Sequence, residues 1–367
     1  SLRYDDAMMK KILFLILVLF ALLAPRSGRA ADWETEWNKT VAAAKAEGQL
    51  VLSIPAGSVW KTELMRFQDT YPDIKVSATT FSGRDFWARF LKEREVGQFL
   101  WDVRIGGYDA QEYQIKQAGN MQPVRDLLLL PEVADNGKWH QGLDGSFLDR
   151  EKKYIFAFIG VDQMTARYNT KVVPRQLTAQ DLVDPKWSGK ISMADPRGGS
   201  SLNGMGGLIR SYGDDFIRKL LVDQKPVITN VPRQQLEWLV SGRYPIAFGL
   251  PSATSLEYAR NGGDISMVGN MAGALQTTMG VGGIAVPTKN PHPAATKLFV
   301  NWLLSRDVQA HLTERVHLNS RRNDVPVVAP EIALDYSRID EYFRPQAEDA
   351  KQYLDEVKKV QAEIGGR

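Results

Sequence analysis

The stretch at residues 181–206, "DLVDPKWSGKISMADPRGGSSLNGMG", contains the basic unit of the fold. It predicts a loop, a strand over "KISMAD", a second loop rich in glycine and serine, and a helix from Leu202. The N-terminus of a helix that follows a strand favours an anion, because backbone N–H groups are unpaired there and the helix dipole is positive. Arg197, Ser200 and Ser201 add polar contacts in this loop. The stretch therefore predicts an anion-binding loop, and the alternative is a helix cap made by Ser200 or Ser201.

Two loops in the first half of the chain have the same strand–loop–helix form. They are "IPAGS" at 54–58, where Ser58 is the predicted N-cap, and "IGGYDA" at 105–110, where Tyr108 follows the strand. Ligands of open α/β sheets bind outside the carboxyl ends of the strands. We therefore expect all three loops to face one crevice.

Strands and helices alternate from Trp33 to the end of the chain, which predicts α/β architecture with parallel strands and helices on both faces. Residues 290–312, "NPHPAATKLFVNWLLSRDVQAHL", predict one long amphipathic helix. Residues 347–364, "AEDAKQYLDEVKKVQAEI", predict a charged helix with an apolar stripe.

Residues 1–30 have the features of a cleavable secretory signal peptide. A basic pair precedes the unbroken apolar run 12–24, Pro25 ends the run, and Gly28 and Ala30 supply the small residues before a cleavage site. A membrane anchor is the competing interpretation, but a bilayer span requires about 20 apolar residues. The segment therefore predicts export to the periplasm.

The charge and cysteine content restrict the function further. Residues 1–7 precede two possible start residues, Met8 and Met9, and we expect them to lie ahead of the natural start. Without residues 1–30 the basic and acidic residues balance, so nothing favours nucleic acid or an anionic membrane as partner. The chain has no cysteine, which excludes disulfides, thiolate metal sites, a cysteine nucleophile and a lipid-modified N-terminal cysteine. We expect a monomer that is free in the periplasm and is not a lipoprotein.

The sequence shows no catalytic, metal or cofactor site. The four histidines (His140, His292, His311 and His317) have no zinc-binding spacing, and no Gly-x-Ser-x-Gly motif is present. We predict no catalytic residues, no metal ligands and no cofactor.

Two groups of side chains have both a structural and a functional interpretation. Core packing is favoured for Trp60, Trp87 and Trp101, and stacking on a ligand is the alternative. Arg321 and Arg322, in "NSRRND", are predicted to lie on a solvated basic face, with one of them reaching the cleft as the alternative.

Several segments together resemble a known family. They are "YNTKVVP" (168–174), "DLVDPKWSGKISMADP" (181–196), "LEWLVSGRYPIAFG" (236–249), "GIAVPTKNPHPAATKLFVNWLLSRDVQ" (283–309) and "SRRNDV" (320–325). In this order they resemble the periplasmic solute-binding proteins of ABC importers, in the branch of the ferric-ion-binding proteins. The resemblance covers nearly all of the chain after the signal segment.

The resemblance implies a two-lobed periplasmic-binding-protein fold of type II-like form, in which each lobe is a mainly parallel sheet flanked by helices and the ligand cleft lies between the lobes. Lobe 1 would comprise residues 32–157 plus 287–367, and lobe 2 residues 158–286. The chain would cross between them near "FIGVD" and "GGIAV". The family delivers a captured solute to an inner-membrane ABC permease and does no chemistry on it, so no enzyme activity is expected.

The chain departs from the iron-binding members at the site itself. Where those members have two adjacent tyrosines, this chain reads "GLPSA" at 249–253, and the histidine and glutamate of their first-lobe loops are missing. The residues present suit a small anionic organic solute that carries a carboxylate or phosphate. The candidate ligand-binding residues are Gly57, Ser58, Trp60, Gly107, Tyr108, Arg197, Gly199, Ser200, Ser201 and Ser252.

Two other functions remain as alternatives. One is a ferric-ion-binding protein that uses a synergistic anion and recruits Tyr108, Tyr258 or Asp162 as ligands. The other, more remote, is an exported enzyme on a similar scaffold, for which the sequence offers no nucleophile–base pair and no metal cluster.

Overall fold

The computed structural model describes residues 27–108, 110–163, 166–250, 255, 258, 262–269, 275–278 and 281–365. Most of the predicted signal segment, residues 1–26, and the candidate residue Ser252 lie outside this part of the chain. Within it, no helix combines the length and the apolar character that crossing a membrane requires.

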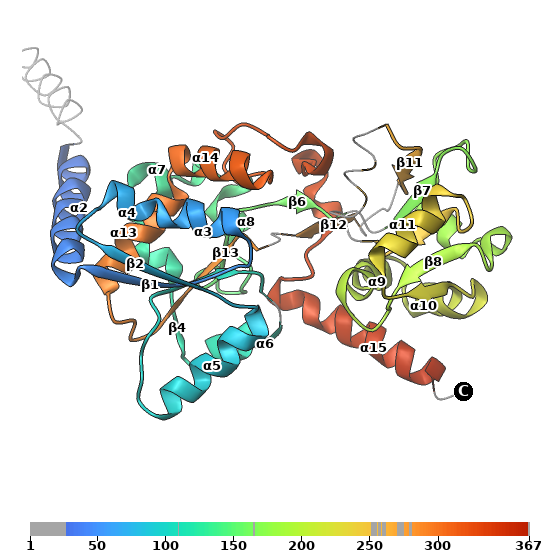
Figure 1. Ribbon diagram of the computed structural model, residues 1–367, viewed down its shortest axis with the longest axis horizontal. Helices are drawn as coiled ribbons and strands as arrows, with labels where there is room; N and C mark the ends of the chain where they lie inside the picture. Colours follow the sequence, from blue (N-terminus) through green and yellow to red (C-terminus); the bar gives the residue numbers. More distant parts are fainter. Residues whose placement is uncertain are drawn as a thin grey trace, which may run out of the picture.

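The first lobe is built on a six-stranded sheet (Figure 1). Its strands are β1 (Gln49–Ile54), β2 (Lys75–Thr80), β3 (Val103–Gly106), β4 (Met121–Gln122), β5 (Phe156–Ala157) and β13 (Gly283–Pro287). The order is β2-β1-β3-β13-β4, and β5 also pairs with β13. Strands β2 and β3 run parallel to β1, whereas β13 is antiparallel to β3, β4 and β5. The loops that follow β1, β2 and β3 therefore emerge at one edge of the sheet.

Helices cover both faces of this sheet. The helices of the lobe are α2 (Ser27–Glu47), α3 (Ser58–Met65), α4 (Phe67–Thr70), α5 (Gly83–Glu95), α6 (Ala110–Gln117), α7 (Pro131–Ala134), α8 (Gly142–Ser146), α13 (Pro293–Leu304) and α14 (Arg306–Val316). Leu50, Leu52 and Ile54 alternate along β1 and join the core with α3 and α13. A second cluster on α5 and nearby segments contains Trp87 and Trp101, so core packing is confirmed for these two tryptophans.

The second lobe has a five-stranded sheet in the order β11-β7-β10-β8-β9. The strands are β7 (Ala166–Asn169), β8 (Ile191–Ala194), β9 (Val227–Thr229), β10 (Ile246–Phe248) and β11 (Ile265–Met267), and the helices are α9 (Gly199–Tyr212), α10 (Asp214–Arg218) and α11 (Pro232–Val240). Strand β8 is parallel to both β9 and β10, while β7 is antiparallel to β10 and β11. The predicted strand and helix within 181–206 are confirmed as β8 and α9. The two-lobed α/β fold is also confirmed.

A small connecting sheet lies between the lobes. It consists of β6 (Val161–Asp162), β12 (Leu275–Thr278) and β14 (Tyr342–Phe343) in the order β14-β12-β6. Strand β12 is antiparallel to β6 and parallel to β14. The chain thus passes between the lobes at three places, whereas the sequence predicts two, and the crossing predicted near "GGIAV" falls on β13 of the first-lobe sheet.

Short 3₁₀ and π turns complete the structure. They are η1 (Val124–Leu127), η2 (Asn136–Lys138), η3 (Ala179–Val183), η4 (Pro185–Trp187), the π turn η5 (Lys219–Asp223), η6 (Pro330–Ile332), η7 (Tyr336–Glu341) and η8 (Glu348–Ala350).

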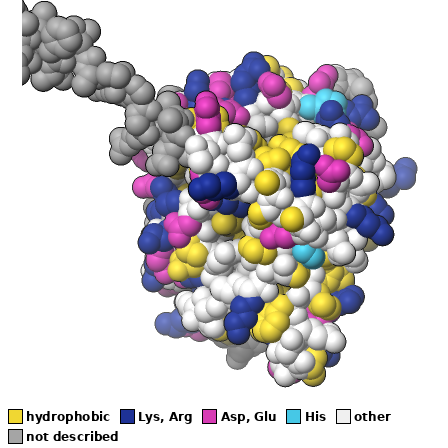
Figure 2. All heavy atoms as spheres, turned by 90° about the vertical axis from the view of Figure 1, so that its left-hand side faces the viewer, with side chains coloured by type: hydrophobic (Ala, Val, Ile, Leu, Met, Phe, Trp, Pro, Cys, Tyr) yellow, Lys and Arg dark blue, Asp and Glu magenta, His cyan; other side chains and the backbone are white. Residues whose placement is uncertain are grey.

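On the face shown in Figure 2, basic and acidic side chains are interspersed. This agrees with the balanced charge of the sequence after residue 30.

The C-terminal helix α15 (Lys351–Gly365) packs on the second lobe, although the sequence assigns residues 287–367 to the first. It contacts α9 and α10, and Val357 and Val360 are buried in the second-lobe core (Figure 1). The chain reaches the second lobe by the third passage, through β14, and α15 follows. The predicted apolar stripe of this helix is the side that packs in the second-lobe core.

Two sequence expectations about the C-terminal third are wrong. The long helix over 290–312 is divided into α13 and α14, because Ser305 has an extended backbone (φ −65°, ψ 152°) and its hydroxyl donates to the carbonyl of Trp302 at 2.7 Å. Arg321 and Arg322 are buried and not solvated. Arg322 pairs with Glu132 at 2.7 Å and with Asp324 at 2.8 Å.

Asn301, on α13, joins this helix to the loop that follows η1. Its Oδ1 accepts hydrogen bonds from the amides of Leu129 and Leu130 at 2.8 and 2.9 Å, and its Nδ2 donates to the carbonyls of Leu127 and Lys297 at 2.8 Å. The side chain is fully buried. Asn301→Ala should therefore lower the free energy of unfolding by about 2–4 kcal/mol, because buried backbone groups lose their partners. Urea denaturation measures this, and a loss below about 1 kcal/mol would contradict it.

Candidate functional site

A cavity of about 690 Å³ lies at the carboxyl ends of the first-lobe strands. Its walls come from the loops after β1, β2 and β3 and from the start of α6. The lining residues are Pro55, Ala56, Phe81, Ser82, Gly83, Asp85, Arg104, Gly107, Tyr108, Glu112, Val281 and Gln346. Gly107 and Tyr108 are the candidate residues that the structure places here.

Two buried charges line this cavity, and the sequence analysis missed both. Arg104 and Glu112 are each 1% exposed. Arg104 Nη1 donates to Ser53 Oγ at 3.2 Å and to its neighbour's carbonyl, Ile105 O, at 2.7 Å, and Trp87 Nε1 donates to Glu112 Oε1 at 2.7 Å. Burial lowers the pKa of Arg104, while the negative charge of Glu112 opposes that shift. The sequence signal for a buried charge was Arg104, which stands in the otherwise apolar strand "VRIG".

Tyr108 is held rigidly beside this pair. Its hydroxyl donates to the carbonyl of Arg104 at 2.8 Å, and the side chain is 4% exposed. Burial raises the pKa of the phenol well above its ordinary value. Tyr108 therefore offers an aromatic wall and a neutral hydroxyl.

The second lobe contributes the N-terminus of α9. The N-cap is Gly198, which has no side chain to accept from the first turn, and Gly199 takes a positive φ of 54°. The predicted cap by Ser200 or Ser201 is therefore wrong. The first amides of α9 have no carbonyl partner one turn earlier in the helix, so they favour an anion.

A cavity of about 270 Å³ lies at this helix end. It is lined by Ala194, Asp195, Gly198, Gly199, Ser200, Thr229, Asn230, Pro232, Gln235 and Gly249. Only Gly199 and Ser200 of these residues are sequence candidates, and the polar side chains of Thr229, Asn230 and Gln235 are among those that were missed. The strand "PVITN" before "VPRQQ" has the same strand–loop–helix form as the other loops and was the signal that pointed to them.

Ser201 has a structural role. It is fully buried, and its hydroxyl donates to Ala194 O at 2.9 Å, which ties α9 to the end of β8. A Cβ on Gly249 would lie 2.0 Å from Ser201 Oγ, so the chain after β10 must have glycine there. Ser201 thus positions the helix end, and its hydroxyl is already bonded.

Arg197 is exposed and already paired within its own loop. Its Nε and Nη2 donate to the Asp195 carboxylate at 2.9 and 2.6 Å, and 81% of the side chain is exposed. The Arg197 guanidinium lowers the pKa of Asp195 to about 2. Because exposed ion pairs contribute little free energy, Arg197 can exchange this partner for a ligand at small cost.

A third cavity, of about 440 Å³, brings the two lobes together. Tyr108 and Tyr113 come from the first lobe, and Arg197, Gly198, Leu202 and Asn203 from the second; the other lining residues are Pro345, Gln346, Ala347, Lys351, Leu354 and Lys358. Arg197 and Tyr108 therefore share one cavity. Two of the three predicted loops therefore line this cavity, whereas residues of the loop 54–58 line the first-lobe cavity instead.

The remaining candidates lie elsewhere. Gly57 is the N-cap of α3 with φ 115°, so the predicted cap by Ser58 is wrong, and both residues are exposed at the helix start. Trp60 is 8% exposed and packs edge-on against Phe158 in the first-lobe core, with ring centroids 6.5 Å apart. Its ring is therefore used in packing.

Asp162 lies on β6 of the connecting sheet. Tyr342 donates its hydroxyl to Asp162 Oδ2 at 3.1 Å. Burial raises the pKa of Asp162 to about 6, although the Tyr342 hydrogen bond and the charges of Arg167 and Arg338 oppose the shift.

This shift predicts a pH effect on stability. The folded state favours protonated Asp162, so the free energy of unfolding should fall as the pH rises from about 4 to about 6 and stay lower above that. Asp162→Asn should stabilise the protein by about 3 kcal/mol above pH 6 and have little effect near pH 4. Denaturation at both pH values measures this.

Asp335→Asn is the matched control for Asp162→Asn. Hydrogen bonds from Ser337 lower the pKa of the exposed Asp335, so this variant should show the opposite sign at neutral pH. A stabilisation by Asp162→Asn that is equal at pH 4 and pH 7 would contradict the assignment.

The described residues show no cluster of carboxylates and imidazoles of the kind that holds a metal ion. Among them no group of three histidine, aspartate or glutamate side chains could hold a metal ion. The three residues named for a ferric site have separate local contacts: Tyr108 bonds to Arg104, Asp162 to Tyr342, and the carbonyl of Tyr258 accepts from the Gly263 amide at 3.1 Å.

Comparisons with known proteins agree with this architecture. Residues 163–315 match the family model "Bacterial extracellular solute-binding protein". No curated protein matches the chain in sequence.

Many solved structures share the fold. Iron-bound HitA from Pseudomonas aeruginosa is 18% identical with a TM-score of 0.61, over 85% of this chain and 99% of that one. A Trichodesmium protein, IdiA (FutA), in complex with iron and citrate ligands, is 16% identical with a TM-score of 0.65, over 85% and 99%. A Bordetella ferric binding protein is 17% identical with a TM-score of 0.65, also over 85% and 99%. At sequence identities this low, the structural similarity shows a shared fold and does not identify the ligand of this chain.

Proposed function

We propose that this chain, a bacterial solute-binding protein by its family match and its two-lobed fold, captures a small anionic organic solute for an ABC importer. The observation that carries the proposal is the uncapped N-terminus of α9, whose loop shares a cavity with Tyr108 of the opposite lobe. The backbone amides of the first turn of α9 and the side chain of Arg197 would bind a carboxylate or phosphate.

The first lobe would hold the remainder of the solute. Phe81 and Tyr108 supply aromatic surface, and Ser82 and Asp85 supply polar groups that suit hydroxyl or amino substituents. A solute that is anionic at one end and polar along its carbon skeleton fits both halves. The candidate contacts of the solute are therefore Gly107, Tyr108, Arg197, Gly199 and Ser200.

Capture would proceed by closure of the lobes about the connecting sheet. Closure requires that the solute bind the closed state more tightly than the open one, and each lobe contributes part of that difference. The solute would leave unchanged, so we propose a carrier and not an enzyme.

The partner would be an inner-membrane ABC permease, and the protein would act as a periplasmic monomer after loss of residues 1–30. We further propose a revised division of the lobes, in which α15 belongs to lobe 2, whereas β13 and residues 288–350 belong with residues 32–157. Its basis is the packing of α15 on α9 and α10.

A thermal-shift screen tests the function. Protein purified without denaturation is melted with sets of carboxylates, phosphates and sulfonates, and we expect one chemical class to raise the Tm in a saturable manner that Ser200→Glu, in the first turn of α9, abolishes. Failure of every anion to raise the Tm would count against the proposal. Native mass spectrometry of the same sample would show a solute that remains bound.

Ferric-ion binding with a synergistic anion is the second candidate, because the fold is shared with iron-binding proteins. Incubation with ferric citrate would then give the visible colour of a phenolate–iron complex. The raised pKa of the buried, bonded Tyr108 phenol argues against that outcome. A colourless, iron-free sample would remove this candidate.

A further inference from the structure

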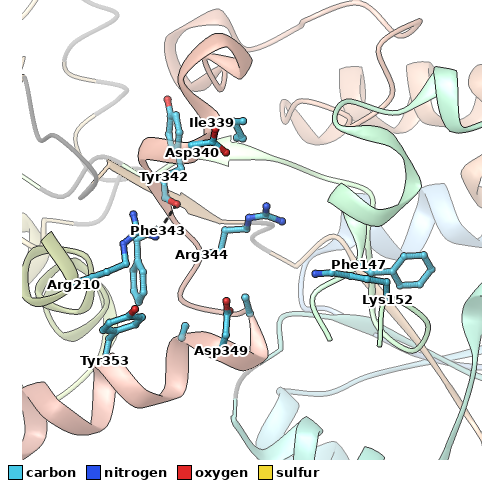
Figure 3. Close-up of a pocket in the computed structure, with 12 residues that line it drawn as sticks. Phe147, Lys152, Arg210, Ile339, Asp340, Tyr342, Phe343, Arg344, Asp349 and Tyr353 are labelled. Atoms are coloured by element: carbon cyan, nitrogen blue, oxygen red, sulfur yellow. Dashed lines mark hydrogen bonds between the residues drawn. The ribbon is translucent and has the colours of Figure 1, made fainter. Parts of the chain in front are cut away.

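A separate cavity of about 210 Å³ lies next to the connecting sheet. Its walls come from the first-lobe segment that contains Phe147 and Lys152, from α9 and α15 of the second lobe, and from residues 339–350, which comprise the end of η7, β14 and the connection to α15 (Figure 3). Both lobes and their connection therefore line one small space.

The lining is rich in positive charge. Lys152, Arg210 and Arg344 line the cavity together with two carboxylates, Asp340 and Asp349. Both aspartates are exposed, so water screens their charges, whereas the three basic residues are partly buried. In Figure 3, Arg344 and Lys152 extend toward the same space from opposite sides.

Arg344 feels the charges of Asp349 and Asp340, and both of these carboxylates are exposed to water. Among the described residues, neither Lys152 nor Arg344 forms a salt bridge within 4.0 Å. The Arg344 hydrogen bond that the structure shows is from Nη1 to the carbonyl of Gly145, at 3.0 Å. The carbonyl is neutral, so the negative charge near this guanidinium comes from the exposed carboxylates of Asp349 and Asp340.

A second buried guanidinium stands behind Arg344. Arg321 is 3% exposed, and its Nη2 donates to the same Gly145 carbonyl at 2.8 Å. Its Nε has no hydrogen-bond partner among the described residues. Burial lowers the pKa of both guanidiniums, yet arginine remains protonated in proteins. Two like charges at one carbonyl are costly unless an anion lies close by.

We propose that this cavity is a second binding site, for a small oxyanion of the phosphate type. Arg344 and Lys152 would bind its oxygens, and Arg321 would add positive charge from behind. Arginine suits such an ion because its planar guanidinium can donate two parallel hydrogen bonds. The ion would add negative charge beside Lys152, Arg210 and Arg344, which outnumber the two exposed carboxylates of the cavity.

The site neighbours the interlobe cavity, with which it shares the lining residue Ala347, but it lies away from the N-terminus of α9. Arg210 lies near the C-terminal end of α9, about 16 Å along the helix axis from Gly199 at 1.5 Å per residue. Because both lobes line the cavity, the affinity for the oxyanion would depend on how the lobes are oriented. If solute binding changes the affinity for the oxyanion by some factor, linkage requires that the oxyanion change the affinity of the cleft for the solute by that same factor.

Inorganic phosphate at constant ionic strength is the probe. A saturable rise in Tm is expected for the full chain at millimolar phosphate, and Arg344→Met and Lys152→Met should each lose it. Lys152→Met keeps the test valid if Arg344→Met fails to fold. The matched control is Arg338→Met, an exposed arginine on η7 that pairs with Glu341 and should keep the full rise.

Ser200→Glu separates this site from the cleft, because it should keep the phosphate response whether or not the proposed function is correct. Loss of the response only in Ser200→Glu would place phosphate in the cleft and overturn the second site. An equal rise in all variants, which general salt effects produce, or no rise in the unmodified protein would also overturn it.

Discussion

Replacing Arg104 by methionine is expected to lower the free energy of unfolding by about 3–5 kcal/mol. The substitution leaves Glu112 buried next to the first-lobe cavity with its opposing charge removed, and a lone buried charge is far more costly than a buried pair. Methionine keeps most of the volume, so the loss would report on charge and hydrogen bonds more than on packing. Urea denaturation at neutral pH measures it.

The double variant Arg104→Met/Glu112→Gln is the control. Glutamine keeps an acceptor for the 2.7 Å hydrogen bond from Trp87 Nε1 and removes the charge. The double variant should recover much of the lost stability, and the double-mutant cycle gives the coupling between the two residues. Additive effects would show that the two charges do not interact, which would contradict the assignment.

Ser200→Glu is expected to weaken solute binding by about a hundredfold or more. A carboxylate in the first turn of α9 would stand where the solute anion is proposed to bind, and two unit charges about 4 Å apart near a protein surface repel by about 4 kcal/mol. The same carboxylate favours the helix dipole by about 0.3–1 kcal/mol, so the variant should be at least as stable as the original. Binding and stability are thus predicted to change in opposite directions.

Ser58→Glu is the matched control, since Ser58 also lies in the first turn of a helix, is exposed, and does not line the cavity at α9. Its effect on affinity should be much smaller. Calorimetric titration with an anion from the screen measures both variants. An unchanged affinity in Ser200→Glu would move the anion away from α9.

The elements of the fold were predictable because their signals are local. The alternation of Leu50, Leu52 and Ile54 marks a strand, and glycine and serine after "KISMAD" mark the loop before α9. The division at Ser305 and the placement of α15 were missed. The first depends on one backbone angle and the second on tertiary packing, and periodicity reports neither.

The candidate site was predictable only in part. The strand-end loops that hold Tyr108 and Arg197 were found because their form repeats along the chain. The partnership of Arg104 with Glu112 depends on how α6 sits on the sheet, and the burial of Trp60 and Ser201 depends on neighbours distant in sequence. Residue type indicated polarity at these positions but not the direction of the side chains.

The central claim is that loops of opposite lobes close around a small anion. Small-angle X-ray scattering of the protein, alone and with the anion that raises its Tm most, tests this claim most directly. The account predicts a smaller radius of gyration with the anion, and no change for Ser200→Glu under the same conditions. A radius of gyration that is unaltered at saturating anion would contradict it.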